Sequence, residues 1–87
     1  MTKKDNLMEC FKVAMDYMQK YVAVKIQLPN DKGETIIFER NAFLNKMKYY
    51  DANYNDELEL KKSPEIKITD FCCANDFESI EVELLGE

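Results

Sequence analysis

The segment Val22–Arg40 constrains the fold more than any other part of this chain, because its pattern predicts two strands joined by a tight turn. From Val22 to Leu28 apolar residues alternate with more polar ones, which is typical of a half-buried strand. Pro29–Gly33 then combines proline, asparagine, aspartate and glycine, which favour a chain reversal. In the return strand we expect Ile36 and Phe38 on the core face, and the other face is formed by Thr35, Ile37 and Glu39. The result is an antiparallel hairpin that needs further elements to cover its apolar face.

The composition supports one small packed domain over residues 1–87. The chain is 46% hydrophobic and contains five phenylalanines and five tyrosines. Its apolar runs are far shorter than the roughly 20 residues that span a bilayer. The first residues also lack the apolar stretch of a signal peptide. We therefore expect a soluble, cytoplasmic protein.

The cysteine and histidine content argues against a metal site and against common forms of catalysis. The chain has no histidine, and its three cysteines, Cys10, Cys72 and Cys73, do not form a CxxC pair. A structural zinc site needs four nitrogen or sulfur ligands, and histidine is the commonest general base. Two glycines are also too few for a glycine-rich phosphate loop. We expect cysteines that pack as small apolar side chains, no cofactor and no enzymatic activity.

Two helices are predicted on either side of the hairpin. The first begins at a cap on Asp5 or Asn6 and extends to about Lys20. The second begins at a cap on Asn41 and frays around 53–56. In both, apolar residues recur at helical spacing: Leu7, Phe11, Ala14, Met15 and Met18 in the first, and Phe43, Leu44, Met47, Tyr50 and Tyr54 in the second.

The rest of the chain predicts one more strand and a last helix. Glu57–Lys62 fits a short strand or a further helical turn, and Ser63–Pro64 predicts a break. Glu65–Cys73 predicts a third strand with Ile66 and Ile68 on one face and Phe71 on the other. Residues 77–85 fit a helix or a strand; a cap at Asn75 or Asp76 and an acidic first turn favour the helix. The predicted architecture is α-β-β-α-β-α, an α+β domain with helices packed on a three-stranded antiparallel sheet.

The charge is distributed unevenly along the chain. Residues 1–50 contain nine basic and six acidic residues, whereas residues 51–87 contain three basic and eleven acidic ones. Such a field repels nucleic acid and attracts basic protein surfaces. We therefore expect no direct nucleic-acid binding, and the short apolar runs described above predict no membrane interaction.

An acidic segment after the second helix resembles the opening of a calcium-binding EF-hand loop. Asp51, Asn53 and Asn55 place oxygen side chains at alternate positions. The match fails at Asp56, where the loop needs glycine, and at Lys62, where it needs a bidentate glutamate. We therefore expect a solvated helix end and no bound metal.

The acidic half predicts a surface that binds a basic protein partner. Tyrosine is enriched at interface hot spots, and carboxylates around it steer a basic partner. Carboxylates spaced like phosphates can also occupy a cationic nucleic-acid channel, so the surface would mimic DNA. The alternative is an acidic surface that only keeps the protein soluble. The predicted partner-binding residues are Tyr50, Asp51, Tyr54, Asp56, Glu57, Glu59, Asp76, Glu78, Glu81 and Glu83.

The PNDKG hairpin, the segment YYDANYNDELELK and the ending ITDFCCANDFESIEVELL are similar to small prophage-encoded proteins of Gram-positive bacteria. That group includes inhibitors of host defence, and anti-CRISPR proteins are among these inhibitors. The resemblance implies a phage-type inhibitor that acts in the host cytoplasm by occluding a basic groove on a nucleic-acid-handling protein.

Two alternatives stay open at the level of the sequence. One is a structural or assembly subunit in which the methionine and tyrosine faces are buried in a homo-oligomer. The other is a small ligand-binding or metal-binding module.

Overall fold

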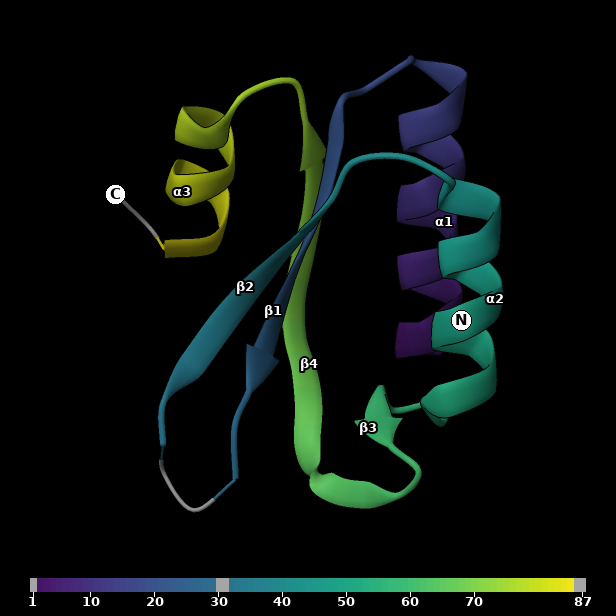
Figure 1. Ribbon diagram of the computed structural model, residues 1–87, viewed down its shortest axis with the longest axis vertical. Coiled ribbons are helices and arrows are strands. Elements are labelled where there is room, and N and C mark those ends of the chain that lie inside the picture. The colour runs from purple at the N-terminus through teal and green to yellow at the C-terminus, as the bar shows by residue number, and fades with distance from the viewer. Residues whose placement is uncertain (1, 30–31, 86–87) are drawn as a thin grey trace.

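Figure 1 shows a computed structural model of the protein, which describes residues 2–29 and 32–85. Within these residues it contains three helices and one antiparallel sheet with the strand order β2-β1-β4-β3. The elements are α1 (Lys3–Asp16), β1 (Tyr21–Gln27), β2 (Glu34–Glu39), α2 (Phe43–Asn53), β3 (Glu59–Leu60), β4 (Ser63–Ala74) and α3 (Phe77–Leu85). The predicted α+β class is confirmed, but the sheet has four strands rather than three.

Helices cover both faces of the sheet: α1 and α2 lie on one side and α3 lies on the other (Figure 1). The larger core is enclosed by α1, α2, the segment before β3 and one face of β1 and β4. The smaller core lies under α3. The larger core contains Leu7, Phe11, Ala14, Val22, Val24, Ile26, Tyr50, Tyr54, Leu58 and Ile68, and the smaller one Ala23, Ala74, Ile80 and Leu84.

The two strands of the hairpin contribute their apolar side chains to different faces. Ile37 lies opposite Val24, whereas Phe38 lies opposite Ala23. Directly opposed residues of an antiparallel pair share a face. Ile36 and Phe38 therefore pack with the α3 core and not on the face of Val24. The prediction of one shared core face was wrong, because it assigned the faces of each strand without knowing the register between them.

A bulge in β4 changes the predicted faces of the third strand. Lys25 pairs with Asp70, but the next residue, Ile26, pairs with Ile68, so Thr69 is an extra residue in β4. Each extra residue shifts the alternation by one position. Phe71 therefore packs against the same core as Ile68. The prediction that Phe71 and Ile68 lie on opposite faces was wrong for this reason.

The undecided segment Glu57–Lys62 contains the short strand β3, and β4 begins earlier than predicted. Pro64 lies inside β4 and is exposed, so the predicted break is wrong. Proline cannot donate a ladder hydrogen bond and is tolerated where no partner needs one. Here the pairing of β4 with β1 includes residues from Lys67 to Ala74 and does not reach Pro64.

The helix caps differ from the predicted ones at both early helices. Thr2 caps α1 in a capping box with Asp5, whose carboxylate accepts a hydrogen bond from the Thr2 backbone N–H at 3.1 Å. The prediction took Asp5 or Asn6 as the cap and was wrong by one turn. Helix α2 begins after Ala42, which has a positive φ of 52° and no side-chain cap, so Asn41 does not cap it.

The last segment is a helix, as the cap and the acidic first turn predicted. The carboxylate of Asp76 accepts a hydrogen bond from the Ser79 backbone N–H at 2.7 Å. This bond favours the charged form and lowers the pKa of Asp76 below its usual range. The side chains of Ile80 and Leu84 then point to the sheet and are buried.

Candidate functional site

The acidic residues predicted to bind a partner lie in two groups on opposite sides of the sheet. One group extends from the end of α2 to the first residue of β3, and the other lies on and just before α3 (Figure 1). The structure therefore does not join them into one surface. The first group is Asp51, Asp56, Glu57 and Glu59, and the second is Asp76, Glu78, Glu81 and Glu83.

The two tyrosines predicted as anchors, Tyr50 and Tyr54, lie in the larger core. Their side chains are 2% and 4% exposed. The ring of Tyr50 lies 5.8 Å from that of Phe11 and 5.6 Å from that of Tyr54. Both residues follow the apolar stripe of α2, so their helical spacing indicated packing rather than recognition. Buried rings of this kind are not available as anchors for a partner.

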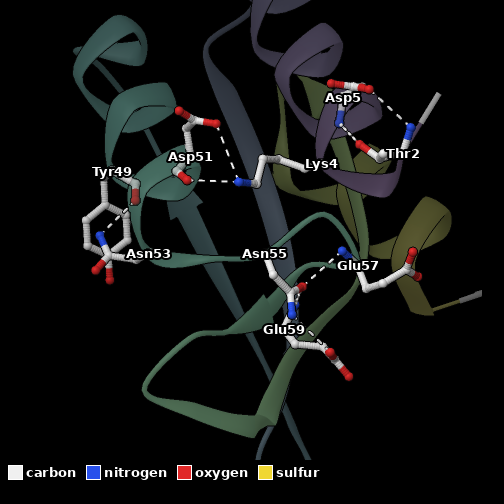
Figure 2. A network of polar contacts seen from close by, with 9 residues as sticks. All are labelled: Thr2, Lys4, Asp5, Tyr49, Asp51, Asn53, Asn55, Glu57 and Glu59. Atoms are coloured by element: carbon white, nitrogen blue, oxygen red, sulfur yellow. Dashed lines mark hydrogen bonds and ion pairs between the residues drawn. The ribbon is translucent and has the colours of Figure 1, made fainter.

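Two of the four carboxylates in the first acidic group are paired with lysines of α1. The Lys4 ammonium lies 3.5 Å from a carboxylate oxygen of Asp51 and donates a hydrogen bond of 2.9 Å to the Asp51 carbonyl oxygen (Figure 2). The Lys3 ammonium lies 3.7 Å from the Glu57 carboxylate. Two lysines of α1 therefore offset part of the negative charge of this group.

Asn55 organises the segment whose spacing resembled an EF-hand. Its side-chain oxygen accepts hydrogen bonds from the backbone N–H groups of Glu57 and Glu59, at 2.9 and 3.0 Å (Figure 2). Its side-chain nitrogen donates to the Glu59 carboxylate at 3.1 Å. The oxygen that a cation would need thus holds a backbone turn. No group of three or more His, Cys, Asp or Glu side chains in residues 2–29 and 32–85 is arranged to hold a metal ion.

The carboxylates of the second acidic group form no ion pair among the described residues. Glu78, Glu81 and Glu83 are exposed, and within the described residues none of them lies in an ion pair. Val82 lies among them and is 57% exposed. A shallow groove of about 380 Å³ runs over this face, lined by Glu78, Ser79, Val82 and Glu83. The outer face of α3 therefore combines an apolar centre with charged surroundings.

A second groove, between β2 and α2, was not predicted from the sequence. It has a volume of about 520 Å³, and Ile37, Glu39, Lys46 and Tyr49 are among the residues that line it. Glu39 is only 9% exposed. One carboxylate oxygen accepts a hydrogen bond from the Tyr50 hydroxyl at 3.3 Å, and the other lies 3.7 Å from the Lys46 ammonium. Both oxygens are engaged, so Glu39 serves as a buried structural carboxylate and not as a free base.

The cysteines have the properties of packing residues. Burial, together with the neighbouring Cys73, raises the pKa of the Cys10 thiol to about 12. Burial and the Glu83 carboxylate raise the pKa of Cys72 to about 11. Thiols with raised pKa values stay protonated near neutral pH and are poor nucleophiles.

The buried hydroxyl of Tyr50 predicts a loss of stability at alkaline pH. Burial and the Glu39 carboxylate raise the pKa of Tyr50 above its ordinary value of 10. A raised pKa in the folded state means that its stabilising contribution is complete below about pH 10 and is lost as the pH rises further. We expect the free energy of unfolding of the wild type, measured in urea, to fall steeply above that pH, and Tyr50→Phe to fall less. Cys10 adds to the fall from about pH 9 in both proteins.

Tyr17→Phe is the matched control for this measurement, because Tyr17 is exposed at the end of α1. It should retain the wild-type dependence on pH. At pH 7, Tyr50→Phe should lose about 1–2 kcal/mol, because the Glu39 carboxylate loses a hydrogen bond. An identical alkaline loss in wild type and Tyr50→Phe would contradict the assignment.

No helix in the described part of the chain has both the length and the apolar character needed to cross a membrane. The sequence matches no protein-family model and no curated protein, and the structure matches no solved structure. The roles of individual residues therefore rest on the geometry of this chain alone.

Proposed function

We propose that the protein is a non-enzymatic, phage-type inhibitor that binds a host nucleic-acid-handling protein through the outer face of α3. One observation carries this proposal. The carboxylates of α3 are exposed and without a basic partner among the described residues, whereas Asp51 and Glu57 are paired with lysines.

The composition of the α3 face suits a basic protein surface. Glu78, Glu81 and Glu83 would attract lysine and arginine side chains over long range and speed the encounter. Val82 at the centre would lose its exposed apolar area on contact, which supplies affinity that charge alone does not. A groove that binds a nucleic-acid backbone responds to the spacing of negative charges before it responds to sequence. Occlusion of such a groove needs no catalytic group on this protein.

The charge of the whole chain supports the same proposal. The net charge is −5, and no basic residue follows Lys67. The hairpin and the ending resemble small prophage-encoded proteins, a group that includes inhibitors of host defence, so host proteins that handle nucleic acids are the partners to search for. Together they favour an acidic mimic over a surface that only maintains solubility.

Charge reversal on α3 tests the proposal. Tagged protein is used to capture partners from the lysate of a Gram-positive host, with washes at low and at high salt and identification by mass spectrometry. We expect a nucleic-acid enzyme that is retained at low salt and released at high salt. The triple variant Glu78→Lys, Glu81→Lys, Glu83→Lys should weaken its binding by about 100-fold or more, because each reversed charge faces a basic surface.

The matched control reverses three carboxylates of the first acidic group: Asp51→Lys, Asp56→Lys and Glu57→Lys. It makes the same change in net charge on the other side of the sheet and should retain the partner. Circular dichroism confirms that both variants are folded. Equal capture by the wild type and the α3 variant would refute the proposal, and loss with the control alone would move the site to the first group.

A further inference from the structure

The strand β2 leaves an unprotected edge of the sheet. It is the first strand in the order β2-β1-β4-β3 and pairs only with β1 among the described strands. The other edge strand, β3, has two residues, but β2 has six, with the sequence ETIIFE. Natural edge strands are commonly shortened, bulged or interrupted by lysine or proline so that they do not pair with another chain. β2 has no bulge, lysine or proline, and its one inward-pointing carboxylate, Glu39, is its last residue.

The hydrogen-bond pattern shows which groups of β2 point outward. The Leu28 N–H donates to the Gly33 carbonyl oxygen at 2.9 Å, which makes this pair a hydrogen-bonded one. Hydrogen-bonded pairs alternate along an antiparallel ladder. In the observed register, Ile37 therefore exchanges its bonds with Val24 of β1. Ile36 and Phe38 direct their N–H and C=O groups away from the sheet.

We infer that two copies of the protein form a two-fold dimer by antiparallel pairing of β2 with β2, centred on Ile37. In this register Ile36 lies opposite Phe38 of the second copy, and Ile37 lies opposite Ile37 at the two-fold axis. Glu34 lies opposite Arg40 of the second copy, just beyond the strand end. The two sheets then continue as one sheet of eight strands. The inference concerns self-association and does not depend on the proposed function.

Backbone phase limits the possible registers, and two side-chain features select this one among them. It pairs the residues whose backbone groups point outward, so the ladder can form with the correct phase. It opposes a carboxylate to a guanidinium twice. It also brings together the apolar side chains of Ile36 and Phe38. A register centred on Ile36 would instead place the Glu34 carboxylate opposite Phe38 and leave Arg40 without an acidic partner.

The apolar surface beside the edge suits the same occupant. Ile37 is 40% exposed on the face of the sheet that α1 and α2 cover, and it lines the groove between β2 and α2. Tyr49 lines that groove from α2 and is also exposed. A second copy that pairs with β2 would cover Ile37 with its own Ile37. The edge and the adjoining groove would then lie along one interface.

A mixing experiment tests the dimer and its register together. Sedimentation of the wild type up to about 1 mM protein should give a mass twice the 10.3 kDa of the chain. Glu34→Arg alone opposes two arginines, and Arg40→Glu alone opposes two glutamates. Each should therefore weaken the dimer by at least about tenfold. An equimolar mixture of the two variants restores both opposite-charge pairs and should dimerise again.

Controls separate pairing from folding. Lys12→Glu makes the same charge change as Arg40→Glu on the exposed surface of α1 and should remain dimeric. Circular dichroism checks the fold of Glu34→Arg, because Glu34 lies 3.7 Å from the Lys25 ammonium. A monomeric wild type at every concentration, or a mixture no more dimeric than its components, would overturn the inference.

A cross-linking experiment reads the register directly. In the inferred dimer Ile37 lies opposite Ile37 of the second copy. This is a non-hydrogen-bonded position, where the Cα atoms of opposed residues lie about 4.5 Å apart. Ile37→Cys should therefore give a covalent dimer under mild oxidation. Thr35→Cys is exposed on the same strand and face but lies opposite residue 39, so it should not cross-link. The wild type controls for the three native cysteines. Cross-linking of Thr35→Cys as fast as Ile37→Cys would overturn this register.

Discussion

Replacing Phe11 with alanine is expected to lower the free energy of unfolding by about 3–5 kcal/mol. Phe11 is fully buried between α1, α2 and the sheet. Its ring lies 5.9 Å from that of Phe43 and 5.8 Å from that of Tyr50. The substitution removes buried apolar area and leaves a cavity between α1, α2 and the sheet, which these elements cannot fill by moving closer together. Small domains are stable by about 5–15 kcal/mol, so this loss is a large part of the total stability.

Urea denaturation followed by circular dichroism measures the effect. Phe77→Ala is the matched control, because it removes the same side chain from a position that is partly exposed on α3. It should cost clearly less than Phe11→Ala. Equal losses for the two variants would show that Phe11 does not lie at the centre of the core.

Replacing Ile80 with alanine is expected to release α3 from the sheet. Ile80 is fully buried, and together with Leu84 it forms the packed face of this helix. Truncation of a buried isoleucine costs about 2–5 kcal/mol. Nine residues are too few for a stable isolated helix in water, so a helix that loses its packing also loses its structure. The larger core lies on the other face of the sheet and should remain folded.

Cleavage by a glutamate-specific protease reports this release, because Glu78, Glu81 and Glu83 lie within α3. Ile80→Ala should be cut in α3 much faster than the wild type, while amide exchange in β1 stays slow. Val82→Ala removes apolar atoms from the exposed face of the same helix and should be cut at the wild-type rate. Wild-type cleavage of Ile80→Ala would show that α3 is held by other contacts.

The elements whose signal is local were predictable from the sequence. Alternation and the turn residues predicted the β1–β2 hairpin. The Asp76 cap and the acidic first turn predicted α3, although its hydrophobic pattern also fitted a strand. Local hydrogen bonds and helix-dipole effects act over a few residues, so a sequence window contains all that determines them.

The elements whose geometry depends on distant pairing could not be predicted. Alternation defines the two faces of each strand, but it does not state which faces of two strands coincide. The bulge at Thr69 and the side taken by Ile36 both arise from such pairing.

The candidate site was only partly predictable for the same reason. The acidic character of the second half was evident, but its division between two sides of the sheet follows from the path of β4. Tyr50 and Tyr54 were predicted as anchors because tyrosine suits interfaces, although their helical spacing already indicated burial.

The central position of β1 has a consequence for the order in which this chain folds. Its partner on one side, β2, follows it closely in the sequence, whereas its partner on the other side, β4, comes much later, after α2 and β3. Closing a long loop costs more conformational entropy than closing a short one, and contacts distant in sequence slow folding. We expect the hairpin to form first and the arrival of β4 to limit the rate. During synthesis on the ribosome β1 emerges well before β4. The edge of β1 that will pair with β4 therefore stays unpaired, and can pair with other strands, until β4 has been made.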